Sequence, residues 1–341
     1  MNTAYAAAGL MWFVVFVYAL AGSVDFGATF WRMRAARTGE RAAHRVAERY
    51  VSPLWEATNV FLVMIAVALV GFFPNAAYAY GSVLLVPGSL ILILLALRGG
   101  FLSQAYGGTE GHAAWARAVT GLTAVLLPAL LVSVLPISQG GLVHAVGDRL
   151  ALDTGALLRS PTEYAYLAFG LSAGLYISAT FLADYARTAG DEEAYAAFRI
   201  RALAAGPVTI LAGVAALFII PSAPWLSARL QAQWPWFVAS LTAFAAAYAA
   251  LVQPLPDGRT PGRPRWAVIL VGLQFAFAQI GYGLAHAPYL LYPYVTTVGS
   301  FTNAAMFTAV LWVVVVGMAV LVPGFVWLWR LFVTDTRYTR S

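Results

Sequence analysis

The stretch Gly22-Ser-Val-Asp25-Phe-Gly27, followed by a basic segment and then by Pro53-Leu-Trp55-Glu56-Ala-Thr-Asn59, decides how this sequence folds. Asp25 and Glu56 lie inside or at the edge of segments that are otherwise apolar enough to span a bilayer. An ionisable group in such a segment is costly unless it faces protein, water or a proton path. The two acids are therefore the first candidates for function, and we interpret the rest of the chain as the scaffold that holds them.

The composition indicates the class of protein. Hydrophobic residues make up 61% of the sequence, charged residues 10%, and the mean hydropathy is +0.77, whereas soluble domains carry about 25% charged residues. We therefore expect an all-α polytopic membrane protein. Cysteine is absent, which excludes disulfides and thiolate metal sites. The formal charge is +6 and all 20 basic residues are arginines; in a membrane protein this excess reports topology, so no nucleic-acid partner is expected.

Nine segments are long and apolar enough to cross a bilayer, which requires about 20 residues each. We expect each to be a helix because exposed backbone groups cannot stay unpaired in lipid. Small residues at 170–174 are expected to let two helices approach closely. The nine segments are 5–30, 51–73, 78–101, 113–135, 164–185, 203–220, 236–252, 266–284 and 307–332.

The arginines predict the orientation. Seventeen of the 20 fall in or beside the first, third, fifth and seventh connections and the carboxyl-terminal tail, whereas Arg149, Arg159 and Arg229 fall on the opposite side. Because cytoplasmic connections carry the excess of positive charge, we expect the amino terminus outside and the carboxyl terminus in the cytoplasm. A missed span would scramble this asymmetry, so it also supports the count of nine.

The chain is expected to form one integral membrane domain with two main parts. Residues 1–136 are predicted to form a first four-helix bundle and residues 161–290 a second, joined by an outer loop at 137–160. The last helix and a cytoplasmic tail, 291–341, are predicted at the periphery. Residues 221–234 contain two tryptophans and an arginine, which is typical of a short helix at the membrane surface.

Helix geometry predicts the depth of the two acids. Asp25 lies 20 residues beyond Tyr5, about 30 Å along a helix, which places it near the cytoplasmic edge. Glu56 enters the second span from that same edge and reaches a depth of about 5–8 Å. The two carboxylates are therefore predicted to share a water-filled notch and to exchange protons with the cytoplasm. The alternative is an interfacial or ion-paired role, with a partner among Arg32, Arg49 and Arg98.

Other residues near these segments are weaker candidates for a functional role. Arg98 closes an apolar run and is either an anchor at the membrane edge or a counter-ion that fixes Asp25 or Glu56. Trp55 is placed to shield Glu56 from lipid. No His-x-x-His or Glu-x-x-His pair exists, so we expect no metal or haem site built by this chain alone. The histidines are His44, His112, His144 and His286, of which the last is interpreted as an interfacial residue.

Three short motifs match the patterns of one known family. Val24-Asp25-Phe26-Gly27 matches the second half of an Asp-Gly-Phe-Asp-x-Gly pattern, and Pro53-Leu54-Trp55-Glu56 matches the start of a Pro-x-Trp-[Asp/Glu]-Gly-Asn pattern. Leu97-Arg98-Gly99 matches a Leu-Arg-Gly pattern, and the segments 287–293 and 321–327 look like the family's last two spans. In these features the sequence resembles subunit II of the cytochrome bd-type quinol oxidases.

This resemblance implies a subunit of a heterodimeric terminal oxidase in a bacterial or archaeal cell membrane. Subunit I is then expected to carry haem b and haem d, to oxidise quinol and to reduce dioxygen to water. Subunit II is expected to be its haem-free partner, which supports assembly and delivers cytoplasmic protons. A structural quinone or lipid and a small single-span accessory subunit are further expectations. The residues expected in the proton route are Asp25 and Glu56, supported by Trp55, Arg98, Asn59 and Ser103.

The sequence also departs from the family pattern. The first Asp of the opening motif is Gly22 here, the Gly-Asn of the second is Ala57-Thr58, and the charged residues after Leu-Arg-Gly are Ser103 and Ala105. These departures leave open a bd-like subunit whose partner uses a different donor or acceptor. A proton-coupled secondary transporter is the other alternative, although transporters usually place their site near the bilayer midplane in broken helices.

Overall fold

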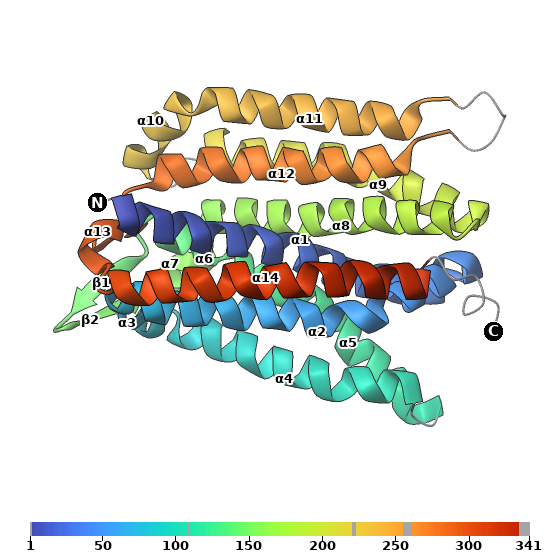
Figure 1. Ribbon diagram of the computed structural model, residues 1–341, viewed down its shortest axis with the longest axis horizontal. Helices are drawn as coiled ribbons and strands as arrows, with labels where there is room; N and C mark the ends of the chain where they lie inside the picture. Colours follow the sequence, from blue (N-terminus) through green and yellow to red (C-terminus); the bar gives the residue numbers. More distant parts are fainter. Residues whose placement is uncertain (1, 108–109, 220–222, 255–260, 334–341) are drawn as a thin grey trace.

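The computed structural model describes residues 2–107, 110–219, 223–254 and 261–333, which form a stack of long helices that run side by side (Figure 1). The long helices are α1 (Asn2–Thr38), α2 (Arg41–Phe72), α4 (Leu85–Gly107), α5 (Glu110–Val132), α8 (Pro161–Thr188), α9 (Glu192–Val214), α11 (Trp234–Val252), α12 (Pro264–His286) and α14 (Ala304–Val333). The shorter ones are α3 (Pro74–Val83), α6 (Val134–Ser138), α7 (Thr154–Arg159), α10 (Pro224–Ala232), α13 (Thr297–Ser300) and a π-helical turn, η1 (Ala215–Ile219). Helix α10 confirms the short helix predicted within residues 221–234.

The helical membrane class predicted from composition is confirmed. Within the described ranges, six helices are long and apolar enough to cross a membrane, and a seventh crossing arises if the bent pair of α3 and α4 counts as one. The turn between α1 and α2 and the turn between α8 and α9 lie at the same end of the stack as the last residues of α14 (Figure 1). The count of nine spans and their orientation stay predictions.

The third predicted segment, 78–101, contains Pro87 and Gly88, which predict a kink, and the structure shows a sharp bend there. The segment is broken at Leu84 into α3 and α4, which are bent by 85° relative to each other. Pro87 explains the break, because proline has no amide hydrogen and its ring clashes with the carbonyl four residues earlier, here that of Val83. The helix therefore restarts at Leu85, where a proline in the first turn is tolerated.

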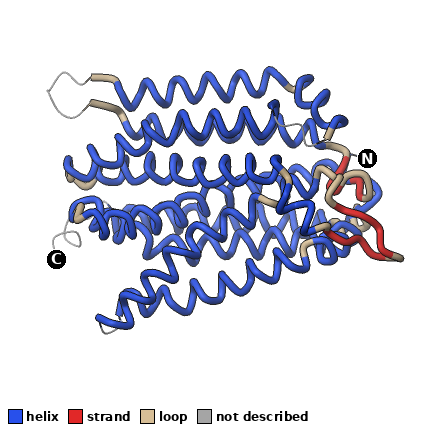
Figure 2. The backbone as a smooth tube through the Cα atoms, turned by 180° about the vertical axis from the view of Figure 1, so that it is seen from behind, coloured by secondary structure: helices blue, strands red, loops and turns tan. Residues whose placement is uncertain are grey.

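Two short β-hairpins connect helices of the otherwise helical fold. Strands β1 (Val143–Val146) and β2 (Arg149–Leu152) pair in the predicted outer loop, around a turn in which Gly147 has a φ of 58°. Strands β3 (Tyr289–Leu291) and β4 (Val295–Thr296) pair between α12 and α13. Both hairpins lie at the end of the stack where the chain begins (Figure 2). They lie at the ends of long helices, where the chain leaves its regular spans.

Helix α1 packs closely against α8 through a residue of the opening motif. A side-chain carbon on Gly27 would lie 2.7 Å from the carbonyl oxygen of Gly174, and closer still to the hydroxyl of Ser178. Trp31 Nε1 donates a hydrogen bond to Ser178 Oγ at 3.1 Å, one turn further along. The close helix approach predicted for residues 170–174 is confirmed, and Gly27 is the position on α1 that permits it.

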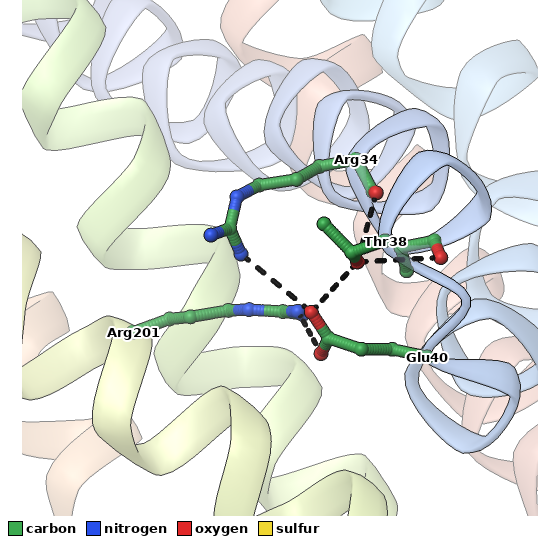
Figure 3. A network of polar contacts seen from close by, with 5 residues as sticks. Arg34, Thr38, Glu40 and Arg201 are labelled. Carbon is green, nitrogen blue, oxygen red and sulfur yellow. Dashed lines mark hydrogen bonds and ion pairs between the residues drawn. The ribbon is translucent and has the colours of Figure 1, made fainter.

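An ion-pair network ties the turn between α1 and α2 to α9 (Figure 3). Glu40 accepts a hydrogen bond from Arg201 Nη2 and another from Thr38 Oγ1 at 2.8 Å. Its carboxylate also lies 3.8 Å from Arg34 Nη1. The guanidinium of Arg201 lies over the ring of Trp31, 5.0 Å from its centroid. The network therefore joins the hairpin formed by α1 and α2 to α9, in the second half of the chain, at the surface of the protein.

We predict that Gly27→Ala destabilises the protein by about 1–3 kcal/mol, the usual cost of forcing extra atoms into a packed contact. The added methyl group would meet Gly174 O and Ser178 Oγ, which belong to a rigid helix. Thermal unfolding of the purified protein measures the effect. Gly174→Ala is the matched control, because a side-chain carbon there meets nothing within 4 Å. Equal melting temperatures for the two variants would contradict this packing.

The charge of Glu40 predicts a pH-dependent contribution to stability. Burial acts to raise the pKa of Glu40, but the hydrogen bond from Thr38 and the charge of Arg201 outweigh it and hold this pKa below its ordinary value. A lowered folded-state pKa stabilises the fold above the ordinary value of about 4.3, and this stability is lost as the pH falls through the folded-state pKa. Because Glu40 is about one-third exposed, its contribution is below about 1 kcal/mol.

We predict that Glu40→Gln lowers the melting temperature at pH 7 and that this difference disappears at acidic pH, below the folded-state pKa of Glu40. Melting temperatures of both proteins across this pH range provide the measurement. Asp148→Asn is the control. Asp148 is exposed in the turn between β1 and β2, so this variant should show no such difference. A difference that persists at low pH would show that the charge of Glu40 is not the cause.

Candidate functional site

A buried ion pair lies between α1 and α4. Arg98 Nη2 donates a hydrogen bond to Asp25 Oδ1 at 2.8 Å. The side chains are only 1% and 3% exposed, respectively. Of the two readings of Arg98 that the sequence left open, the structure therefore supports the counter-ion, because an anchor at the membrane edge would leave its guanidinium exposed. Of the three candidate partners of Asp25, Arg98 is the one paired with it.

The guanidinium of Arg98 connects three helices. Its Nη2 also donates to Thr29 Oγ1 at 2.9 Å on α1, and its Nη1 donates to the carbonyl oxygen of Thr120 at 3.3 Å on α5. The hydroxyl of Thr29 in turn donates to the backbone carbonyl of Asp25 at 3.0 Å. The ring of Phe26 lies 5.1 Å from the guanidinium carbon. These contacts hold the ion pair in one geometry.

The pair has polar neighbours that are not satisfied. Arg98 Nε and the hydroxyl of Tyr18, two turns earlier on α1, are buried without a hydrogen-bond partner among the described residues. The hydroxyl of Tyr18 interacts electrostatically with both Asp25 and Arg98. A buried donor without a partner costs about 1–3 kcal/mol. The interior beside the ion pair therefore remains polar and favours further hydrogen bonding.

Glu56 lies at a similar height to Asp25, on the neighbouring helix. Asp25 is 13 residues before the end of α1, and Glu56 is 15 residues after the start of α2. At 1.5 Å per residue, these are about 20 and 23 Å from the turn that joins the helices. The side chains of Trp55, Glu56 and Ser103 lie outside the part of the chain that the structure describes, so only their helical backbone is placed.

Two positions at which the sequence departs from the family pattern, Gly22 on α1 and Thr58 on α2, face each other. A side-chain carbon on Gly22 would lie 3.8 Å from Thr58 Cγ2 and 3.4 Å from the ring of Phe26. A carboxylate at position 22 would therefore enter a space bounded by a methyl group and an aromatic ring. Asn59, the next residue, is half-buried, and no hydrogen bond joins it to Asp25 or Arg98 in the described part of the chain.

The sequence reasoning missed Tyr18, Thr29 and Thr120. Thr29 follows Asp25 by four residues, a spacing that places both on one face of a helix and could have identified it. Tyr18 precedes Asp25 by seven residues and lies on the same face for the same reason. Thr120 contributes its backbone carbonyl, which carries no sequence signal.

The side chain of His286 has two hydrogen-bond partners. His286 is buried, with Nδ1 2.9 Å from the carbonyl of Tyr289 and Nε2 3.3 Å from Ser138 Oγ. Both ring nitrogens therefore have partners at the end of α12, which agrees with the interpretation of His286 as a satisfied residue near the end of a span. Among the described residues, no group of three or more histidine, aspartate or glutamate side chains could hold a metal ion. At the same end of the stack, the buried side chain of Glu163 is hydrogen-bonded to Ser133.

We predict that removing one partner of the ion pair lowers the stability of the protein more than removing both partners does. Arg98→Gln leaves a buried carboxylate without a counter-charge and should destabilise the protein by about 3–5 kcal/mol. The double variant Asp25→Asn, Arg98→Gln has no uncompensated charge and should recover part of that loss. Thermal unfolding of the variants provides the measurement. Asp191→Asn is the control, because Asp191 pairs with an Arg45 side chain that is 60% exposed, and an exposed ion pair contributes little to stability. A double variant less stable than Arg98→Gln would contradict the pairing.

Comparison with known proteins assigns the family. The sequence model described as cytochrome bd terminal oxidase subunit II matches residues 3–332. A Bacillus subtilis (strain 168) protein named as a cytochrome bd menaquinol oxidase subunit II is 38% identical over 337 residues, which cover 98% of this chain and 97% of that protein. The solved structure of bd oxidase from Geobacillus thermodenitrificans matches with a TM-score of 0.82 and 36% identity, covering 98% of this chain and 100% of the matched one.

These matches extend over nearly the whole chain, so the resemblance seen in the short motifs of the first three spans is confirmed. Subunit II is a component of a quinol:oxygen oxidoreductase complex, in which subunit I is the partner and houses the haems. The apolar helices agree with a multi-pass protein of the cytoplasmic membrane. This chain belongs to the cytochrome bd terminal oxidase subunit II family and is a subunit of a terminal quinol oxidase.

Proposed function

We propose that this subunit delivers cytoplasmic protons to the oxidase, with Asp25 and Glu56 as the acids of the route. The observation that carries the proposal is the buried ion pair of Asp25 with Arg98. Charged side chains within membrane-spanning segments are costly, and they commonly mark substrate or proton paths. The Tyr18 hydroxyl and Arg98 Nε, which have no hydrogen-bond partner among the described residues, add hydrogen-bonding capacity beside this pair. A purely apolar helix interface would need none of these groups.

The two acids have different roles in this proposal. Asp25 is held by a guanidinium that stays charged, so it gives the route a fixed polar end. Glu56, at a similar height on α2, is the group that takes up and passes on the proton. Trp55 shields Glu56 from lipid, and Asn59 adds an amide one turn deeper. Ser103, five residues beyond Arg98 on α4, adds a hydroxyl toward the end of that helix.

The proposal includes the topology predicted from the arginines. Nine spans, with the amino terminus outside and the carboxyl terminus in the cytoplasm, would place the turn between α1 and α2 in the cytoplasm. Asp25 and Glu56 would then be reached from the proton-supplying side. Two four-helix bundles, residues 1–136 and 161–290, would be joined by the outer loop 137–160, with residues 291–341 at the periphery.

The proposed complex assigns the redox chemistry to the partner. Haem b and haem d are held by subunit I, and this chain is haem-free and supports assembly. Its Bacillus subtilis relative is named as a menaquinol oxidase subunit, which favours menaquinol as the electron donor. A structural quinone or lipid and a small single-span accessory subunit complete the proposed assembly.

We predict that Glu56→Gln lowers oxidase turnover by about 10²-fold, the lower end of the effect of removing a positioned proton-transfer group. The haem content of the purified complex should stay at the wild-type level, because Glu56 binds no haem in this proposal. Oxygen consumption with quinol, measured across pH together with the absorption spectrum, provides the test.

Glu163→Gln is the matched control for this prediction. It also replaces a glutamate of a long helix by glutamine; the side chain of Glu163 is buried and lies at the opposite end of the stack from the proposed entrance. It should leave turnover near the wild-type value. Wild-type turnover of Glu56→Gln at every pH would remove Glu56 from the route, and equal losses in both variants would point to a general structural effect.

A further inference from the structure

A groove of about 590 Å³ lies between α11 and α12, at the end of the stack where the arginines gather. One wall consists of Ala246, Ala249 and Ala250, which recur on one face of α11. Trp266 and Leu270, one turn apart on α12, form the opposite wall. The small alanine side chains leave an open apolar trough along this face of α11.

The mouth of the groove is polar and positively charged. Gln253 and Arg263 line it, and both side chains are exposed. The side chain of Arg263 makes no hydrogen bond or ion pair within the described ranges. Arg199 Nε donates to the carbonyl of Leu251 at 2.6 Å, which brings a second guanidinium to this end of α11. The mouth therefore presents a guanidinium, that of Arg263, that is not paired with any of the described residues.

The backbone adds further donors at the same place. Helix α12 begins at Pro264, which has no amide hydrogen, and Ala267 N donates to Arg263 O at 3.2 Å. Among the described residues, the amide groups of Arg265 and Trp266 are therefore the ones that remain available in the first turn. The nearby carboxylate of Asp184 is 3.0 Å from Arg265 Nε and is neutralised by it. No carboxylate of the described residues lines the groove. An anionic group at the mouth would meet arginine, amide and helix-end donors together.

The groove faces the surroundings of the subunit. Helix α11 is the outermost helix in both views, with α12 directly beneath it (Figures 1 and 2). Apolar side chains such as Leu241, Ile269 and Leu273 are exposed on these two helices, as expected for a surface that contacts lipid. Trp266, which is 58% exposed, lies where the polar mouth meets the apolar trough. Tryptophan prefers this position at a membrane interface.

We propose that this groove binds one anionic phospholipid, with its phosphate at Arg263 and Gln253 and one acyl chain along the alanine wall. Charge complementarity selects the headgroup, because the mouth offers donors and positive charge, while the trough offers apolar contact. The proposal rests on the membrane location of the subunit and is independent of the proton route. Its outcome therefore does not depend on that of the Glu56 experiment.

The experiment uses the purified oxidase complex, stripped of lipid in detergent and titrated with phosphatidylglycerol or phosphatidylcholine in native mass spectrometry. We expect Arg263→Gln to weaken phosphatidylglycerol binding about fivefold, the effect of one arginine near an anionic lipid. Arg37→Gln removes an exposed arginine from the same end of the molecule and should leave binding unchanged. Ala249→Leu fills the exposed trough without changing the charge and should also weaken binding.

Four results would overturn the proposal. Phosphatidylcholine that binds the wild-type complex as tightly as phosphatidylglycerol would remove the headgroup selectivity. An equal loss in Arg37→Gln and Arg263→Gln would show a general attraction to a basic surface. Wild-type binding by Ala249→Leu would place the acyl chain elsewhere. Inorganic phosphate that raises the melting temperature of the complex as much as phosphatidylglycerol does would assign the mouth to a free anion.

Discussion

The pairing of Asp25 with Arg98 is the interaction that the rest of the structure must accommodate. Removing two charges from water costs several kcal/mol per ion, and their attraction compensates only if the geometry is held and the remaining hydrogen bonds are supplied. Thr29 and the carbonyl of Thr120 supply those bonds. The positions of α1, α4 and α5 relative to one another therefore depend on a single guanidinium, which is 1% exposed.

Helix α1 connects this polar site to the remainder of the fold. Asp25 and Gly27 are two residues apart, about 200° around a helix, so they face nearly opposite directions. One face pairs with Arg98 on α4, while the other meets Gly174 and Ser178 on α8. The short motif thus combines a charge that needs a partner with a glycine that needs close packing. An acid proposed to lie beside a proton route is held in place by contacts on both sides of its helix.

Much of the architecture could be predicted because it depends on local properties of the chain. Apolar segments of sufficient length predict helices in a membrane, and small residues predict where helices approach closely, as Gly174 and Gly27 confirm. Pro87 and Gly88 mark a local break in the third apolar segment, but they do not give its size; the structure shows a bend of 85° at Leu84. The hairpin of β1 and β2 was missed because its strands are short and lie in a segment that reads as a polar loop.

The sequence by itself determined the membrane class, the choice of Asp25 and Glu56 as candidate residues, and a set of three arginines as possible partners for Asp25. Only the tertiary structure decided that Arg98 is that partner, that Tyr18 and Thr120 lie beside it, and that Gly22 faces Thr58. The physical reason is that composition and periodicity describe each helix separately, whereas an ion pair between helices depends on which helices become neighbours. Packing determines which helices become neighbours, and here it brings together Asp25 and Arg98, which are 73 residues apart in the chain.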